Sequence, residues 1–366
     1  MVDPAAPPAP ATAGWRRFAG VAITLAIMGM ALHALAGEFS EHGYRQIRIA
    51  MHALSWSQLG LALLLGMASY GCLIGFDAIG LRRANRRLPA GRVAITAFLA
   101  HAAGQTLGFA ALTGGAIRVR SYGNAGLGLA EIGQVVLMST LGFVFGAWVL
   151  LGLALWLEPG AAALALPLAV PWVRMLGIAL LLGFGAMWLL VGAGGRSMGW
   201  RRHRVWIPDR RTVLEVTALS LVELGLASAA FYVLLPAQDG VGYIGFVGLY
   251  LVAVVAGLLS TVPAGLGVFE WSLLKLLPQV APAAILAAAV AYRVTYYLVP
   301  LFLSTLLAGL AAIRRPLRSG GSTAWNVLRP WLPQVIALAV FAVGALLVID
   351  GTLPAPEDYA DCNSPP

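Results

Sequence analysis

Charged residues are scarce in this 366-residue chain: Asp, Glu, Lys and Arg make up 11% of it, whereas 60% is hydrophobic. Because soluble domains usually hold about 25% charged residues, this composition excludes an ordinary soluble enzyme or binding domain. Cysteine is also rare. Cys72 and Cys362 are the only two, and they give neither a metal-ligand spacing nor a disulfide framework. Lysine occurs once, at Lys275.

Enzyme motifs are absent as well. Gly-x-Gly occurs at 126–128 and 265–267, but neither follows a strand of a βαβ unit, so nucleotide binding is not indicated. The chain has no Gly-Lys-Ser/Thr phosphate loop, no His-Glu-x-x-His and no paired Asp-rich motif for Mg²⁺. We therefore expect no catalytic residue, no cofactor and no metal. Transport driven by ATP hydrolysis in this chain is excluded.

Long apolar runs recur along the whole length, and each approaches the roughly 20 residues that cross a bilayer. They predict an all-α polytopic membrane protein. The runs lie at residues 18–36, 56–80, 92–112, 130–157, 171–192, 213–235, 242–262, 283–313 and 331–349. The formal charge of +9 does not indicate a nucleic-acid partner, because the arginines lie in short loops beside these runs.

The arginines predict the topology, because short loops rich in Lys and Arg face the cytoplasm. They cluster at 16–17, 82–92, 196–211 and 314–329. If every run crossed the membrane, an odd number of crossings would place the cluster at 196–211 outside. We therefore expect two segments that enter and return on one side: 92–128 from the cytoplasm, and 242–278 from outside.

This count gives about seven full spans plus two oppositely oriented re-entrant segments, which is typical of an inverted repeat. An offset of 152 residues aligns Gly115 with Gly267 and Arg118 with Glu270; chance similarity between Gly/Ala-rich segments is the alternative. The expected units are a disordered cytoplasmic tail at 1–14, a transmembrane domain at 15–315, a further span at 331–349 and an acidic outer tail at 350–366.

Two glycine-rich segments, 113–118 and 262–270, interrupt apolar runs and each carries a charge. Charged groups and non-helical backbone are costly at membrane depth, so both segments indicate a transport site. The candidate substrate-binding residues are Arg118, Glu270, Glu223, Arg293, Asp77, Lys275, Gly114, Gly115, Gly265 and Gly267.

Each of the two segments has a functional and a structural interpretation. Arg118 either holds the phosphodiester of a lipid headgroup as a guanidinium fork or is an interfacial arginine beside bulk phosphate. Glu270 either stabilises the start of a helix or pairs with Lys275, five residues on, or with a cationic headgroup.

The remaining candidates are open in the same way. Glu223, in the middle of an apolar run, is either an ion-pair partner of Arg293 or a site for a cation or headgroup. Asp77 either pairs with Arg82 or Arg83 or belongs to the substrate-binding site. His101 and Gln105 either line a cavity or form an interior pair.

These segments resemble the transmembrane region of the lysylphosphatidylglycerol synthetase/flippase family, also called the multiple peptide resistance factor family. The similar parts are LTGGAIR at 112–118 with Tyr122 and Gly126, AEI at 130–132, and PAGLGVFE at 263–270. The resemblance covers about 15–315. It implies charged sites at Asp77, Arg118, Glu223 and Glu270, and the aminoacyltransferase domain of bifunctional members is missing.

The resemblance implies a non-enzymatic lipid flippase of the bacterial cytoplasmic membrane. It would move lysyl- or alanyl-phosphatidylglycerol, or a similar phospholipid, to the outer leaflet, and would contribute to resistance against antimicrobial peptides. The alternative is a membrane subunit or partial chain of an aminoacyl-phospholipid synthase. The expected partners are membrane phospholipids and a synthase domain or separate synthase; self-association into a homo-oligomer is open.

Overall fold

The computed structural model describes residues 44–107, 110–165, 168–191, 196–200, 203–236, 241–260 and 262–313. The tail expected at 1–14, the first apolar run, the span expected at 331–349 and the tail expected at 350–366 all lie outside the described residues.

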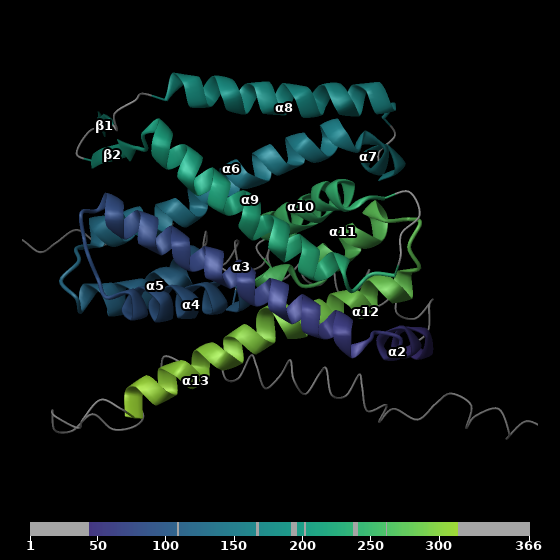
Figure 1. Cartoon of the computed structure of the whole chain (residues 1–366), viewed down its shortest axis with the longest axis horizontal. Helices are drawn as coiled ribbons and strands as arrows, with labels where there is room; N and C mark the ends of the chain where they lie inside the picture. Colours follow the sequence, from purple (N-terminus) through teal and green to yellow (C-terminus); the bar gives the residue numbers. More distant parts are fainter. Residues whose placement is uncertain are drawn as a thin grey trace, which may run out of the picture.

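The described part of the chain is helical apart from one short antiparallel hairpin (Figure 1). The elements are, in chain order, α2 (Tyr44–His52), α3 (Trp56–Arg83), α4 (Ala90–Leu107), α5 (Ala110–Gly123), α6 (Leu129–Leu157), α7 (Pro159–Ala165), α8 (Val170–Leu190), β1 (Arg196–Trp200), β2 (His203–Ile207), α9 (Arg210–Tyr232), α10 (Tyr243–Leu259), η1 (Pro263–Gly265), α11 (Val268–Leu276), α12 (Pro282–Tyr292), η2 (Arg293–Leu298) and α13 (Val299–Ile313).

Five of these helical runs are long and apolar enough to cross a membrane. Four are single helices, α3, α6, α8 and α9, and the fifth joins α12, η2 and the first part of α13. Each matches an apolar run of the sequence, and each exceeds the roughly 20 residues that a bilayer requires. The chain is therefore an integral membrane protein.

Helix α3 illustrates how the sequence sets an element. Ser55 and Gln58 form a capping box at its start, which satisfies amide groups that would otherwise lack acceptors. The helix packs against α6 and α9. A Cβ added to Gly80 would lie 2.6 Å from the Cα of Val135 on α6, so glycine is what allows these two backbones to approach.

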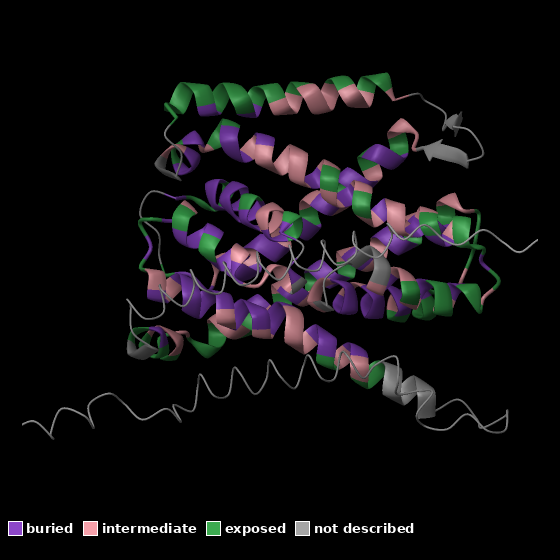
Figure 2. Cartoon of the chain, turned by 180° about the vertical axis from the view of Figure 1, so that it is seen from behind, coloured by how far each residue is buried: buried purple, intermediate pink, exposed green. Residues whose placement is uncertain are grey.

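Burial divides the helices into a centre and a periphery (Figure 2). In the most apolar stretch of α8 only 11% of the residues are buried, against 67% in the run through α12 and η2. Large side chains of α8, such as Trp172, Leu182 and Leu190, are exposed. An apolar exposed helix suits contact with lipid, whereas α12 and η2 belong to the protein interior.

The first segment expected to be re-entrant forms a helical hairpin of α4 and α5, but its break is not where the glycines are. Residues 113–118 all lie inside α5, so the prediction of a glycine break there is wrong. Gly114 has another role, because a Cβ on it would lie 2.8 Å from the carbonyl oxygen of Ala100. The glycine thus permits close packing of α5 on α4 rather than a turn.

The second expected segment does contain a break. Helix α10 is followed by η1 and then by α11, and three residues between them have positive φ: Ala264 at 53°, Gly265 at 62° and Gly267 at 81°. Left-handed backbone is accessible to glycine at little cost. The prediction of a non-helical segment around Pro263 and Gly265 is therefore confirmed.

The two hairpins occupy opposite halves of the long axis (Figure 1). The pair α4 and α5 lies at the end where α3 finishes and where the β1–β2 hairpin lies, while α10 and α11 lie at the end that holds α2 and α7. The long helices α3, α6 and α9 run between the two ends. The apolar run predicted at 283–313 is also helical, but η2 winds as a π-helix between its two α-helical parts.

Candidate functional site

A cluster of polar side chains surrounds Asp77 in the interior of the first half. Asp77, on α3, is fully buried, and Arg118, on α5, is 3% exposed. The Arg118 Nε lies 2.9 Å from Asp77 Oδ2 and its Nη2 lies 2.6 Å from Oδ1. This is the two-pronged geometry in which a guanidinium binds a carboxylate most strongly.

Two further side chains complete this Asp77–Arg118 cluster. The Tyr122 hydroxyl donates to Asp77 Oδ2 over 2.7 Å, and Tyr122 lies one helical turn after Arg118, so both point to the same side of α5. His101 of α4 places its Nε2 2.8 Å from Arg118 Nη2. Because a guanidinium has only donors, His101 accepts this hydrogen bond.

A second buried ion pair lies in the other half. Glu270, on α11, and Arg293, the first residue of η2, are 5% and 7% exposed. The Arg293 Nε donates to Glu270 Oε1 over 2.7 Å. The ring of Tyr297, one turn further along, faces the guanidinium at 5.8 Å, a distance within the range of cation–π attraction.

The Glu270–Arg293 pair is tied to the backbone of the glycine turn. The Gly267 amide donates to Glu270 Oε2 over 2.9 Å, and Arg293 Nη1 donates to the Ala264 carbonyl oxygen over 3.3 Å. Glu270 thus contacts Gly267 at the end of the turn, and Arg293 contacts Ala264 in its middle. The left-handed residues of this turn set the position of both charges.

Glu223 lies on α9 and is 6% exposed. Its Oε1 accepts hydrogen bonds from the Ser69 hydroxyl of α3 at 3.1 Å and from the Tyr296 hydroxyl of η2 at 3.4 Å. Those two hydroxyls are 2.9 Å apart. No described basic side chain forms an ion pair with Glu223.

Glu223 lies between the two ion pairs, because its hydrogen-bond partners are on α3, which also carries Asp77, and on η2, which also carries Arg293. Ser69 and Asp77 are both on α3, eight residues and therefore roughly 12 Å apart. Tyr296 follows Arg293 by three residues on η2. The buried polar groups therefore follow one another from the first half of the molecule to the second.

Tyrosines and an amide fill the space around Glu223. The Tyr70 hydroxyl lies 3.3 Å from Gln105 Oε1 and 3.3 Å from the backbone oxygen of Tyr296. Tyr296 stacks on Tyr292 with ring centroids 4.9 Å apart, and Tyr292 hydrogen-bonds the Tyr250 hydroxyl at 2.8 Å. Gln105 lies one turn after His101 on α4, so this side of the helix connects the tyrosines to the Asp77–Arg118 cluster.

The structure corrects several sequence-based alternatives. Asp77 pairs with Arg118 and not with Arg82 or Arg83. Arg293 pairs with Glu270 and not with Glu223. The reason is the same for both, because the apolar runs fix how deep a charge lies but not which helix faces it.

The remaining predicted residues contribute less to the clusters. Lys275 is exposed, and the Glu270 carboxylate accepts hydrogen bonds from the Gly267 amide and from Arg293. Gly115 has open space where a side chain would begin. His101 and Gln105 bind Arg118 and Tyr70 rather than each other. Ser69 and Tyr296 were not predicted as site residues; the three tyrosines at 292, 296 and 297 of this apolar run are the sequence signal that points to the second.

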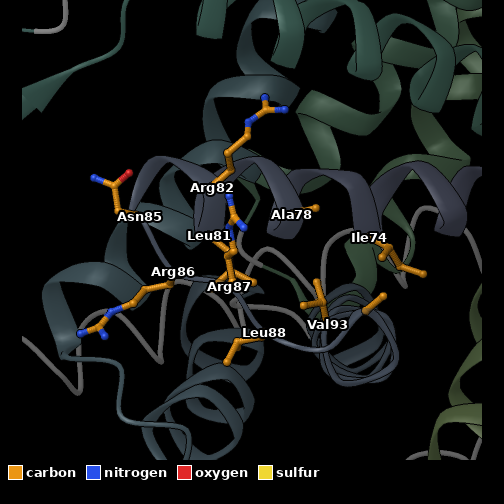
Figure 3. Close-up of a pocket in the computed structure, with 10 residues that line it drawn as sticks. Ile74, Ala78, Leu81, Arg82, Asn85, Arg86, Arg87, Leu88 and Val93 are labelled. Carbon is orange, nitrogen blue, oxygen red and sulfur yellow. The ribbon is translucent and has the colours of Figure 1, made fainter.

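A pocket of about 580 Å³ opens where α3 ends and α4 begins (Figure 3). Ile74 and Val93 give it an apolar side, and four polar residues give it a basic one: Arg82, Asn85, Arg86 and Arg87. Arg82 and Arg86 form ion pairs with Glu215 and Glu131. Arg87 has no acidic partner among the described residues, so the pocket retains an uncompensated positive charge.

Metal chemistry receives no support from the described residues, among which no group of three or more His, Cys, Asp or Glu side chains is placed to hold an ion. The arrangement instead offers two closed ion pairs, a carboxyl group between them and a basic pocket at one end.

Comparison with known proteins adds the following. No protein-family model matches the sequence. The uncharacterized protein slr0712 of Synechocystis sp. is 30% identical over 298 residues, which cover 80% of this chain and 92% of that protein. The inner membrane protein YbhN of Escherichia coli is 28% identical over 243 residues, 64% of this chain and 73% of YbhN.

A shorter similarity involves an enzyme whose name refers to a phospholipid. A phosphatidylglycerol lysyltransferase of Staphylococcus epidermidis is 32% identical over 95 residues, which are 25% of this chain and 11% of the transferase. The resemblance predicted over about 15–315 is therefore supported only over 95 residues, and these are a small part of that longer protein.

Proposed function

Because the chain belongs to the family of the Synechocystis protein slr0712 and is an integral membrane protein, we propose that it moves phospholipids between the two leaflets of a bacterial cytoplasmic membrane. The substrate class is a phospholipid whose headgroup carries both a phosphate and an ammonium group, such as lysyl- or alanyl-phosphatidylglycerol. The partial similarity to a phosphatidylglycerol lysyltransferase supports this class.

The proposed topology has seven full spans and two re-entrant hairpins of opposite orientation. Hairpin α4–α5 enters from the cytoplasm and hairpin α10–α11 from outside, in an inverted repeat that places the N-terminus in the cytoplasm. The location of the two hairpins in opposite halves of the molecule supports this arrangement (Figure 1). The arginines at 82–92 and 196–211 then face the cytoplasm together.

The observation that carries the proposal is the pair of buried ion pairs, one in each half. A buried arginine and carboxylate are neutral as a pair but costly to separate. A headgroup with a phosphate and an ammonium can replace both partners of the ion pair. Its phosphate binds Arg118 in place of Asp77, and its ammonium binds Asp77 in place of Arg118. One ion pair becomes two, so the interior remains neutral while alanyl-phosphatidylglycerol, with one phosphate and one ammonium group, is bound.

The same exchange is available at the opposite half. The phosphate binds Arg293 and the ammonium binds Glu270. The Gly267 amide and the Ala264 carbonyl oxygen keep both side chains in position. Alternate opening of the two pairs then moves the headgroup from one side to the other, and the acyl chains stay in lipid.

The basic pocket fits the cytoplasmic side of this cycle. Its apolar wall, which includes Ile74 and Val93, suits the first carbons of an acyl chain, and Arg87 suits the phosphate (Figure 3). Lipids of the inner leaflet would collect there before they reach Arg118.

Reconstitution tests the function directly. The protein is placed in liposomes that contain fluorescent lysyl-, alanyl- or unmodified phosphatidylglycerol, and an impermeant quencher reports how fast label crosses between leaflets. We expect Arg118→Gln and Arg293→Gln each to slow exchange at least about tenfold, which corresponds to 1.4 kcal/mol of lost binding. Arg118→Lys keeps the charge but loses the fork, so an intermediate rate is expected.

Arg211→Gln is the matched control, because Arg211 also pairs with a glutamate but its side chain is 81% exposed. Its exchange rate should equal that of the wild type. Arg118→Gln and Arg293→Gln proteins that insert normally and exchange lipid at the wild-type rate would overturn the proposal.

The second candidate function is a membrane subunit or partial chain of an aminoacyl-phospholipid synthase, which the similarity to a lysyltransferase favours. A transferase that co-purifies with this chain, together with lipid exchange no faster than in empty liposomes, would favour it over the flippase.

A further inference from the structure

The structure describes three buried carboxylates, Asp77, Glu223 and Glu270, and Glu223 differs from the other two. Asp77 and Glu270 each lie against an arginine. The described donors to Glu223 are hydroxyl groups, from Ser69 and Tyr296. A hydroxyl satisfies a lone pair without supplying a compensating charge.

Groups that face Glu223 from the neighbouring helices are uncharged. Helix α3 contributes Tyr70 and Cys72, α10 contributes Tyr250, and η2 contributes Tyr296. Of the other helices that pack on α9, α12 contributes the ring of Tyr292, and the remaining charged groups lie toward helix ends. They are Glu131 near the start of α6, Glu158 just after its end and Arg174 on α8.

A carboxylate in such a place behaves differently from one in an ion pair. Removing its charge from water without a partner is expensive, and the cost disappears when the group binds a proton. Protonation of Asp77 or Glu270 would leave an arginine buried alone, whereas protonation of Glu223 leaves no charge uncompensated. Glu223 can therefore change its charge without disrupting either ion pair.

We propose that Glu223 is a proton-binding site that couples lipid movement to the proton gradient. The carboxylate takes up a proton when the protein is open to one side and releases that proton when it is open to the other. This inference rests on the proposed function, since the coupled movement is that of the lipid. Proton binding itself is a separate property of Glu223 and is measured separately below.

The hydrogen bonds around Glu223 suit proton movement. Ser69 and Tyr296 are 2.9 Å apart, and either hydroxyl can donate to the other. Tyr70 lies within hydrogen-bond distance of the Tyr296 backbone oxygen and of Gln105, and Gln105 is one turn from His101. Polar groups thus extend from Glu223 toward the Asp77–Arg118 cluster.

A calcium ion fits this place poorly. One carboxylate and a few hydroxyls fall short of the six or more oxygen ligands that Ca²⁺ takes, and no described group of acidic and histidine residues adds to them. The ammonium of a lipid headgroup is the competing occupant, and the experiments below separate it from a proton.

The first experiment measures coupling. Liposomes with the protein hold labelled alanyl-phosphatidylglycerol, the membrane potential is set to zero, and a difference of one pH unit is imposed. If one proton moves with each lipid, the label should accumulate in one leaflet by a factor of about ten, the concentration ratio equivalent to one pH unit. The Glu223→Gln protein, which resembles the protonated form, should exchange lipid without accumulating it.

Glu215→Gln is the control on the same helix, because Glu215 is a partly exposed glutamate paired with Arg82 and Arg211. It should accumulate lipid as the wild type does. Accumulation by Glu223→Gln, or simple equilibration by the wild type, would overturn the coupling and leave the flippase standing. Loss of headgroup binding by Glu223→Gln at every pH would assign Glu223 to the ammonium instead.

The second experiment measures proton binding without transport. Infrared difference spectra of the protein in lipid, recorded during a pH titration, should show a carboxylic acid band that is absent from Glu223→Gln and present in Glu215→Gln. Ser69→Ala keeps the carboxyl group and should shift the band, because one hydrogen bond is lost. If the wild type moves no lipid, the flippase fails and this band still decides the proton site; its absence from the wild type overturns the site.

Discussion

The two halves of the molecule contain the same chemistry built in opposite ways. In the α4–α5 half the hairpin carries the cation, Arg118, and a long helix carries the acid, Asp77. In the α10–α11 half the hairpin carries the acid, Glu270, and the long run carries Arg293. Each ion pair is neutral, so similar sites can arise with the charges exchanged between the hairpin and the long helical run.

The halves also differ in what holds their ion pair. Side chains hold the first, since Tyr122 and His101 complete the cluster. Backbone holds the second, since Gly267 and Ala264 supply an amide and a carbonyl oxygen. Substitutions of these side chains should therefore disturb the first ion pair more, and substitutions of the turn glycines the second.

The largest effect should follow from separating a buried pair. Asp77→Ala leaves Arg118 buried without its carboxylate, and we expect a loss of about 3–5 kcal/mol in the free energy of unfolding. In the double variant Asp77→Ala/Arg118→Leu no buried charge is left unpaired, so it should be more stable than Asp77→Ala. Denaturant unfolding in detergent micelles measures both; additive losses would mean that the two residues do not interact.

The second-largest effect should follow from removing a tyrosine hydroxyl, and its cost in stability should differ between the two halves. Tyr122→Phe removes a donor to the buried Asp77 carboxylate, and we expect a loss of about 1.5–3 kcal/mol. Tyr297→Phe keeps the ring that faces Arg293 and should cost much less. The same unfolding measurement compares them, and equal losses would show that the first pair does not depend on its hydroxyl.

Substitutions of the glycines in the η1 turn, which holds the second pair, should have a smaller effect. Gly265→Ala and Gly267→Ala place an L side chain at φ values of 62° and 81°, which costs roughly 1–2 kcal/mol each. Gly115→Ala lies in a helix with open space around its Cβ and should be neutral or stabilising by up to about 1 kcal/mol. Thermal unfolding of the three variants tests this order. Destabilisation by Gly115→Ala equal to the others would mean that the first half also needs a special backbone.

A surface ion pair provides the smallest effect and a reference for the buried ones. Arg83 lies 3.1 Å from Asp209 just before α9. Burial raises the pKa of Asp209, but a hydrogen bond from Thr212 and the charge of Arg83 outweigh it and hold the pKa below its usual value. Stability from this group is thus present above the unfolded pKa and is lost as the pH falls through the folded one.

Asp209→Asn should therefore cost no more than about 1 kcal/mol at neutral pH. The difference from the wild type should fade below about pH 4, where the wild-type aspartate also becomes protonated. Unfolding curves of both proteins at neutral pH and below about pH 4 measure this difference in stability. A constant difference at both would show that the charge of Asp209 contributes nothing.

The charged residues of the site could be found from sequence, and their partners could not. Asp77, Arg118, Glu223, Glu270 and Arg293 are conspicuous because ionisable groups are rare in apolar runs. Their pairings join residues 41 and 23 positions apart, and they depend on how helices pack. Periodicity shows which residues are buried but not which helix lies opposite.

The two glycine segments show the same limit for the fold. Pro263, Gly265 and Gly267 lie together, and the combination of proline with nearby glycines correctly predicted a break. Gly114 and Gly115 gave an equally strong signal, yet both lie inside α5. A pair of glycines in a membrane helix can serve close packing instead of a turn, and sequence alone does not separate the two uses.

The π-helical winding of η2 has a consequence for anyone who maps this protein with chemical labels. A π turn holds one more residue than an α turn, so its effect on the following helix equals a one-residue insertion, a rotation of roughly 100°. A helical wheel drawn from 282 to 313 at constant pitch would assign the wrong face of α13 to lipid. Cysteine accessibility along 299–307 should follow the pattern of α12 only after a phase shift of one residue.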